Sequence, residues 1–253
     1  MKNPKKHQKD QKTIVGRVHS VETLGTRDGP GLRCIFFLAG CNFRCSFCQN
    51  PDTWFSKGSH CMTIDEARER LIGLLPYLQP HGGLTVSGGE PCLQPAFVQA
   101  LFTIAHELGL STVLDTNGSC PPRKRQALLA VTDIVLLDIK ASEDKLHRKI
   151  TGKPLAPVLA FGRLAAQVPN RLVIRRVLLP GINNSEHEMN RLADYALSLP
   201  FQPKIELIPY HRLGAHKWSE LNIPYSLSKL KLPTANDLKK ATDLLEQRGL
   251  ETI

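Results

Sequence analysis

The sequence predicts an α/β fold in which parallel strands alternate with helices. Six short apolar runs recur along the chain, and segments with apolar residues three or four positions apart lie between them. The length of 253 residues and the hydrophobic content of 42% suit a single domain of the α/β-barrel size. Because a closed barrel would need eight such units, six units predict either a partial barrel or an open doubly wound sheet.

The expected strands are short. A first strand pattern over residues 14–21 precedes the alternation. The six runs that follow it span residues 34–38, 84–86, 112–114, 134–137, 172–178 and 205–208. Parallel strands joined by right-handed crossovers place their carboxyl ends at one edge of the sheet, so that edge is where functional residues are expected.

Capping residues predict where several helices begin. Thr63 with Glu66 is typical of a capping box, and it precedes a segment with clear helical spacing. Ser185 with Glu188 predicts a second helix start, and Asn236 is the expected N-cap of the last helix. Helical spacing thus fills the gaps between the apolar runs, as the alternating fold requires.

The two ends of the sequence differ from its middle. Residues 1–12 hold five lysines against one aspartate, so they supply +4 of the net charge of +10, and we expect a basic disordered tail there. Residues 13–253 are expected to form one core domain with a C-terminal loop and helix. Within it, residues 211–234 contain Pro and Gly and show little periodicity, which predicts a long functional loop.

Composition argues against several classes of protein. No run approaches the 18 apolar residues of a membrane span, and we find no signal peptide, so we expect a cytoplasmic protein. A basic cluster or zinc module on nucleic acid remains an alternative. It would need a fourth metal ligand and aromatic residues among the basic ones, and the aromatic content is only 6%. Nucleic acid is therefore not an expected partner.

Three of the seven cysteines lie within eight residues, directly after the first of the six runs. Cys41, Cys45 and Cys48 form a C-x-x-x-C-x-x-C pattern. Structural zinc sites use four ligands in paired sets, and a fully ligated iron–sulfur cluster uses four cysteines. Three thiolates leave one iron open to a small molecule, so the pattern predicts an iron–sulfur cluster that binds a cosubstrate. The other four cysteines are expected to be buried or free thiols without a function.

Polar residues follow the carboxyl ends of the other runs as well. A Gly-Gly-Glu turn at residues 88–90 follows the second run, and Asp115 closes the third. Asp138 and Lys140 come at the end of the fourth run, and His211 comes after the sixth. Each alone would be an ordinary turn or loop residue, but their shared position at one edge of the sheet predicts a single site with the cysteines.

The segment C-N-F-R-C-S-F-C-Q-N-P-D-T-W resembles the cluster loop of radical S-adenosylmethionine enzymes. More narrowly, it is similar to the activating enzymes of glycyl-radical enzymes, of the pyruvate formate-lyase type. Further matching motifs are D-G-P-G at 28–31, S-G-G-E-P at 87–91, D-T-N-G at 115–118, L-D-I-K at 137–140, V-L-L-P-G at 177–181 and P-Y-H-R-L-G at 209–214. Two residues depart from the family pattern: Gln49 replaces the usual His, and Phe47 replaces a common Tyr.

The resemblance implies a partial (β/α)6 barrel of the radical S-adenosylmethionine type, with one 4Fe–4S cluster on three cysteines. Cys41, Cys45, Cys48 and Lys140 would be the catalytic residues. The implied contacts to S-adenosylmethionine are Phe47, Cys48, Gln49, Gly88, Gly89, Glu90, Asp115, Asp138, Ile139, Lys140 and His211. A monovalent cation, Na⁺ or K⁺, would lie at Asp115, Thr116 and Asp138, and Asp28 and Arg175 would hold a peptide of the partner.

The resemblance also implies the reaction and the partners. Reductive cleavage of S-adenosylmethionine would generate a glycyl radical in pyruvate formate-lyase, and flavodoxin or ferredoxin would donate the electron to a monomeric enzyme. No second set of cysteines lies between residues 48 and 88, which favours this simple type over activating enzymes with extra clusters. The alternatives are an activase of another glycyl-radical enzyme and a radical enzyme that acts on a small molecule.

Overall fold

The computed structural model describes residues 14–56 and 58–253, so the predicted basic tail lies outside the described residues. One sheet of eight strands runs through the molecule in the order β3-β1-β2-β4-β5-β6-β7-β8. Its six parallel strands are β2 (Arg33–Leu38), β4 (Gly83–Gly88), β5 (Ser111–Thr116), β6 (Ile134–Asp138), β7 (Leu172–Leu178) and β8 (Lys204–Pro209). These six strands confirm the six predicted runs.

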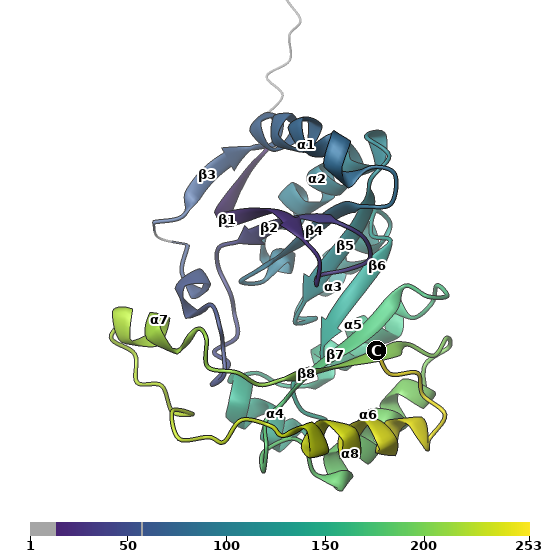
Figure 1. Cartoon of the computed structure of the whole chain (residues 1–253). Coiled ribbons are helices and arrows are strands. Elements are labelled where there is room, and N and C mark those ends of the chain that lie inside the picture. The colour runs from purple at the N-terminus through teal and green to yellow at the C-terminus, as the bar shows by residue number, and fades with distance from the viewer. Residues whose placement is uncertain (1–13, 57) are drawn as a thin grey trace, which may run out of the picture.

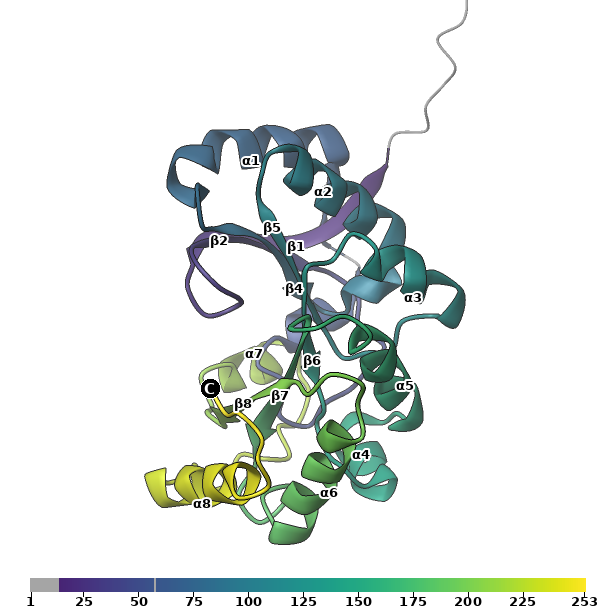
Figure 2. The ribbon, with the colours of Figure 1, turned by 90° about the vertical axis from the view of Figure 1, so that its right-hand side faces the viewer.

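The sheet curves but does not close, because β3 and β8 form its two edges. The strand pattern over residues 14–21 is confirmed as β1 (Val15–Gly25), which pairs antiparallel with β2. The edge strand β3 (His60–Thr63) was not predicted, since its sequence His-Cys-Met-Thr offers no apolar run. Helices cover the outer face of the curved sheet, and the inner face stays open along one side (Figures 1 and 2). The fold is therefore the partial barrel.

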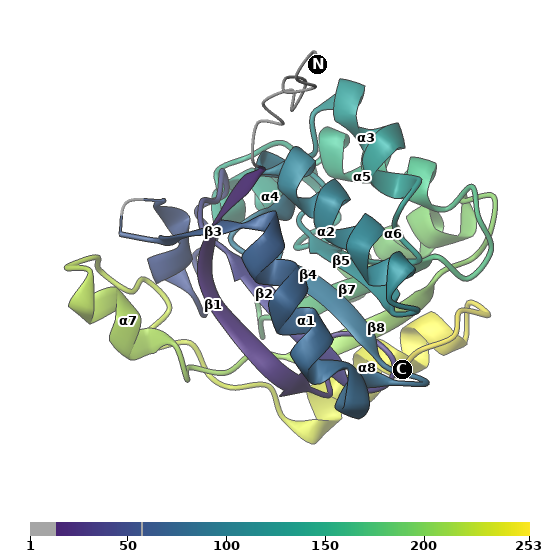
Figure 3. The same ribbon diagram turned by 90° about the horizontal axis from the view of Figure 1, so that it is seen from above.

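The helices on the outer face follow the predicted alternation (Figure 3). They are α1 (Ile64–Leu78), α2 (Pro95–Glu107), α3 (Pro122–Leu129), α4 (Asp144–Thr151), α5 (Ala156–Ala165), α6 (Glu186–Leu197) and α8 (Ala235–Glu246). The short helix α7 (Ala215–Glu220) does not cover the sheet and lies beside residues 51–54 (Figure 1). Two short 3₁₀ helices, Pro51–Trp54 and Pro91–Leu93, belong to the loops after β2 and β4. Within the described ranges no helix has the length and apolarity that crossing a membrane requires.

The capping predictions are confirmed for two helices and wrong for one. Thr63 and Glu66 form the capping box of α1, and the Ser185 hydroxyl accepts a bond from the backbone of Glu188 at the start of α6. For α8 the N-cap is Thr234, which shares a capping box with Asp237, so Asn236 lies inside the first turn. Thr at the N-cap with Asp three positions on satisfies two helix N–H groups, whereas Asn236 would satisfy one at most.

A buried arginine connects the sheet to the loop that holds the D-G-P-G motif. The Arg33 side chain is fully buried and donates hydrogen bonds to the backbone of Pro30, Leu84 and Ser111. It also bonds the hydroxyl of Thr85. Every donor in a buried guanidinium needs an acceptor. The network therefore ties Pro30 of the motif to strands β4 and β5.

Candidate active site

Residues 41–54, which we call the cluster loop, follow β2 and are held in place by backbone hydrogen bonds. Gly40 and Cys41 donate to the carbonyls of Thr53 and Trp54 at 2.7 and 3.2 Å. The Cys48 N–H closes a tight turn onto the Cys45 carbonyl at 3.1 Å. An irregular loop keeps its shape only when its backbone groups are paired in this way, so the three thiols are held in fixed directions.

The three cysteines line one cavity of about 200 Å³ together with residues from four strand ends. Of the residues implied to bind S-adenosylmethionine, the cavity is lined by Phe47, Cys48, Gln49, Gly88, Gly89, Asp115, Asp138 and Lys140. Thr116 also lines it, while Ile139, His211, Glu90, Asp28 and Arg175 do not. The structure therefore brings most of the predicted site together at the carboxyl edge of the sheet.

The thiols have the chemistry of cluster ligands. Burial raises the pKa of Cys41 to about 11 and raises the pKa of Cys45 and of Cys48 as well. Bare thiols in this cavity are therefore protonated at neutral pH and become thiolates when they bind a metal. In the described ranges no three His, Cys, Asp or Glu side chains are arranged around a single metal ion. Three separated thiols around a cavity suit a cluster, whose iron atoms are ligated one by one.

The turn at the end of β4 requires glycine at positions 88 and 89. Gly88 has a φ of +109°, and a Cβ there would lie 2.3 Å from the backbone nitrogen of Leu38. A Cβ on Gly89 would lie 2.2 Å from the carbonyl oxygen of Gly40. The turn thus packs directly against the start of the cluster loop and exposes its own backbone groups to the cavity.

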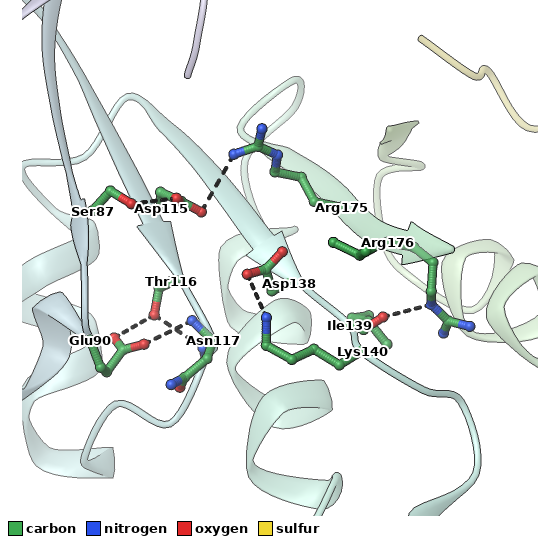
Figure 4. A network of polar contacts seen from close by, with 12 residues as sticks. Ser87, Glu90, Asp115, Thr116, Asn117, Asp138, Ile139, Lys140, Arg175 and Arg176 are labelled. Carbon is green, nitrogen blue, oxygen red and sulfur yellow. Dashed lines mark hydrogen bonds and ion pairs between the residues drawn. The ribbon is translucent and has the colours of Figure 1, made fainter. Parts of the chain in front are cut away.

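The Glu90 side chain holds this turn in place through hydrogen bonds. It is fully buried, and its carboxylate accepts hydrogen bonds from the Thr116 hydroxyl at 2.6 Å and from the backbone N–H of Asn117 (Figure 4). It also accepts a bond from the backbone N–H of Cys92. Burial raises the pKa of Glu90, although these hydrogen bonds oppose the shift. The side chain joins the loops after β4 and β5, so its part in the site is exerted through the backbone of the turn.

Lys140 places a positive charge in the cavity. Its ammonium donates to the Asp138 carboxylate at 2.8 Å and lies 5.4 Å from the centre of the Phe47 ring. Burial alone would lower the pKa of Lys140, but the carboxylate of Asp138 and, when ionised, the thiolate of Cys45 raise it. A permanently charged lysine beside the cysteines favours thiolates and suits an anionic group of a cosubstrate.

Asp115 forms a second carboxylate centre on β5, beside Asp138 in Figure 4. It accepts a hydrogen bond from Ser87 at 2.6 Å, and Arg175 on β7 lies 3.7 Å away. Burial raises the pKa of Asp115 to about 7 against the opposing charge of Arg175. Arg175 also forms ion pairs with Asp28 of the D-G-P-G motif and with Glu206 on β8, so it connects three acidic groups along the open side of the barrel.

Residues 211–234 lie against the cluster loop. Gln49 donates to the His211 carbonyl at 2.9 Å and accepts from the Gly214 N–H at 2.8 Å. The Trp218 indole donates to the Cys48 carbonyl at 2.9 Å. This segment contains the short helix α7 and is thus not a plain loop. The imidazole of His211 is exposed and lies outside the cavity, and its backbone makes the contact.

The sequence interpretation missed several residues in and around the site, and two of them contact the cysteines directly. Asn117 lines the cavity, and its amide lies 3.8 Å from the Cys41 sulfur. Trp218 contacts the backbone of Cys48 and packs edge-on against Trp54 with ring centres 5.0 Å apart. Asn117 belongs to the D-T-N-G motif and could have been found there. Trp218 gives no local signal, because 170 positions separate it from its partner Cys48.

Comparison with known proteins identifies the family of the chain. The model of the radical SAM superfamily matches residues 35–193. The pyruvate formate-lyase-activating enzyme of Staphylococcus epidermidis is 42% identical over 236 residues, which cover 90% of this chain and 94% of that protein. The enzyme of the same name from Staphylococcus aureus is 40% identical and covers 93% of this chain and 97% of its own length. The chain belongs to the pyruvate formate-lyase-activating enzyme family of the radical SAM superfamily.

Solved structures of the superfamily share the fold. A domain of a pyruvate-formate lyase-activating enzyme from Bacteroides vulgatus superposes with a TM-score of 0.58 at 24% identity, and it covers 68% of this chain and 98% of that one. A radical SAM methyltransferase from Sphaerobacter thermophilus gives a TM-score of 0.65 at 17% identity, over 87% of this chain and 65% of its own. Both likenesses support the partial barrel predicted from the sequence.

Proposed function

We propose that this chain activates pyruvate formate-lyase by reductive cleavage of S-adenosylmethionine and formation of a glycyl radical. The observation that carries the proposal is the convergence of the three thiols, the glycine turn and the Asp138–Lys140 pair on one cavity. Cys41, Cys45 and Cys48 would hold a 4Fe–4S cluster. When bound, that cluster supplies the electron that cleaves S-adenosylmethionine into methionine and a 5′-deoxyadenosyl radical.

The chain's own residues orient the cosubstrate. The exposed backbone groups of Gly88 and Gly89 are suited to the amino group of S-adenosylmethionine, and the ammonium of Lys140 is suited to its carboxylate. Phe43 and Phe47 are buried beside the thiols and exclude water from the cavity. These contacts fix the sulfonium close to the cysteines without any residue having to form a covalent bond to it.

The neighbouring carboxylates support a cation site as part of the proposal. Asp138 raises the pKa of Asp115 after the larger effect of burial, so the two negative charges repel each other. A monovalent cation, Na⁺ or K⁺, would relieve that repulsion near the carboxylate of the cosubstrate. Thr116 would contribute its backbone oxygen, because its hydroxyl donates to Glu90.

The partner's glycine would enter from the open side of the barrel. A second cavity of about 740 Å³ lies there and is lined by Pro30, Leu136, Val173, Arg175 and Ile208, among others. Its apolar residues and its charged side chains, Arg27, Arg175, Lys204 and Glu206, fit an extended peptide, whose backbone needs polar partners. Asp28 lies next to this cavity, because it forms an ion pair with Arg175. A glycine is favoured as the target because it has no side chain to exclude from the narrow site.

The experiment is anaerobic incubation of the reduced, cluster-loaded enzyme with S-adenosylmethionine and pyruvate formate-lyase. We expect a stable organic radical by electron paramagnetic resonance, and deuterium at the α-carbon of the target glycine should appear in 5′-deoxyadenosine. Unlabelled deoxyadenosine without a protein radical, with every glycyl-radical partner supplied, would contradict the proposal and favour a small-molecule substrate. Flavodoxin or ferredoxin as the donor and a monomeric enzyme complete the proposed system.

A further inference from the structure

Helix α4 and the turn after it present basic side chains on the outer surface beside the cluster loop. Lys145, Arg148 and Lys149 on α4 and Lys153 after it are exposed, while His147 on the opposite side of the helix is buried. Only Arg148 among these cations has an ion pair within residues 14–56 and 58–253, with Asp144. We call Lys145, Arg148, Lys149 and Lys153 the α4 basic face.

This face is directly joined to the cluster loop. The backbone N–H groups of Arg44 and Ser46 donate to the carbonyls of Thr151 and Ile150 at 2.9 and 2.8 Å. These two bonds flank Cys45, so the end of α4 is paired with the centre of the loop. The ring of Phe43 also packs edge-on against His147, with ring centres 5.7 Å apart. The α4 basic face is therefore the surface just behind a predicted cluster ligand.

Helix stability accounts for only part of this charge. Arg148 and Lys149 lie in the last turn of α4, where cations interact favourably with the helix dipole. Lys145 lies in the first turn, where a cation is unfavourable, and Lys153 lies beyond the helix end. Two of the four charges thus have no role in holding the helix. At its N-terminal end the exposed Glu143 and Asp144 precede Lys145, so the basic surface is strongest from Arg148 to Lys153.

An electron must reach the cluster while the cavity side is occupied. The cavity that the three thiols line would be filled by S-adenosylmethionine, and the adjoining open side of the barrel would hold the peptide. A donor therefore has to approach from the other side of the cluster loop. Arg44 is exposed on that side, and α4 borders it. A basic surface there is complementary to an acidic partner.

We infer that the α4 basic face is the docking surface for an acidic one-electron carrier protein that reduces the cluster. The inference rests on the proposed function and adds the place where the electron enters. In the docked complex one electron leaves the reduced carrier and enters the cluster, and no covalent bond forms or breaks. Charge complementarity speeds encounter and is screened by salt, so the rate of reduction should depend on ionic strength.

The test compares two matched charge reversals. Lys145→Glu with Lys149→Glu changes the face, and Lys239→Glu with Lys240→Glu makes the same change in charge on α8, which lies apart from α4 in two views (Figures 2 and 3). The rate of reduction of the loaded enzyme by a reduced acidic flavodoxin is followed by anaerobic stopped-flow absorbance. We expect the α4 pair to slow it on the order of tenfold at low salt, with the difference shrinking as salt is added. The α8 pair should stay near the wild-type rate.

Reduction by dithionite separates docking from folding and from the proposed function. Both double variants should take up iron and be reduced by dithionite as the wild type is. If the α4 charge reversal fails to load, Lys145→Gln with Lys149→Gln removes the charges without adding new ones and should show a smaller slowing. Equal rates for the α4 and α8 variants with flavodoxin would overturn the docking surface. Activation of pyruvate formate-lyase by the dithionite-reduced enzyme tests the proposed function independently of any donor protein.

Discussion

The two sides of the active-site cavity obtain their geometry in different ways. On one side, Asp115 and Asp138 lie at the carboxyl ends of the neighbouring parallel strands β5 and β6, and the sheet register sets Asp115 opposite Leu136, two residues before Asp138. On the other side, the cysteines lie on an irregular loop that depends on partners from α4, from residues 53–54 and from residues 211–218. The sheet side is therefore determined by local sequence, and the loop side is determined by contacts between distant segments.

The largest effect is expected when one of the three cysteines of the cluster loop is replaced. Cys45→Ala should abolish the cluster and all cleavage of S-adenosylmethionine, because a ligand is lost from a site that has only three. Iron and sulfide analysis, together with the absorbance of the cluster, measures how much cluster each variant holds. Cys61→Ala is the matched control, since Cys61 is exposed on β3 away from the cavity. Full iron loading in the Cys45 variant would contradict the cluster assignment.

The next effect tests the contact between the two sides. A methyl group at position 89 would collide with the Gly40 carbonyl, so Gly89→Ala should destabilise the fold by roughly 1–3 kcal/mol and impair binding of S-adenosylmethionine. Gly73→Ala is the control, because a Cβ there meets nothing within 4 Å in helix α1. That control should stabilise the protein by about 0.5–1 kcal/mol. Thermal unfolding and calorimetric titration measure both, and equal unfolding temperatures would remove the steric argument.

A third change removes a charged side chain that follows β6 on the sheet side. Lys140→Ala should leave iron loading intact and weaken binding of S-adenosylmethionine by about 1–3 kcal/mol, since a charge-assisted contact is lost. Equilibrium titration of the loaded enzyme measures the affinity. Lys239→Ala on exposed α8 serves as the control for removal of a lysine. An unchanged affinity in the Lys140 variant would place the cosubstrate away from the Asp138–Lys140 pair.

A smaller effect is expected from Gln49, which connects the loop to the segment after β8. Gln49→Glu keeps an acceptor for the Gly214 N–H but loses the donor to the His211 carbonyl, and Gln49→Leu loses both. We expect the leucine variant to lose about 1 kcal/mol of stability. The amide hydrogen of Gly214 should exchange faster in the leucine variant than in the glutamate variant. Identical exchange in both would show that Gln49 does not hold the segment.

The last pair of changes distinguishes two possible N-caps of α8, and Asn236→Ala has the smallest expected effect. Thr234→Ala should lower the free energy of unfolding by about 1 kcal/mol, because its hydroxyl accepts from the backbone of Asp237. Asn236→Ala should change it by less than about 0.5 kcal/mol, as a substitution inside the first turn of an exposed helix does. Chemical denaturation of the two variants measures the difference. A larger loss at Asn236 than at Thr234 would restore the original sequence prediction.

The parts of the site that could be predicted share a local signal. Each of these signals lies within a few residues of sequence: the cysteine spacing, the glycine pair and the carboxylates at strand ends. The parallel sheet then brings them to one edge. Trp218 and the pairing of Gln49 with Gly214 could not be predicted, since they join residues more than 160 positions apart. The edge strand β3 was missed for a related reason: its pairing with β1, and not its own composition, makes it a strand.

The sequence by itself determined the six parallel strands, the family and the three cysteines that line the cavity, because periodicity and motif spacing are local properties of the chain. The tertiary structure decided which predicted residues face the cavity. In the folded protein the Glu90 carboxylate bonds the backbone of Asn117 and does not line the cavity. The His211 side chain also lies outside the cavity. Helix α4 pairs with the centre of the cluster loop. The direction of a side chain depends on the backbone and neighbours that folding supplies, and no residue type specifies it alone.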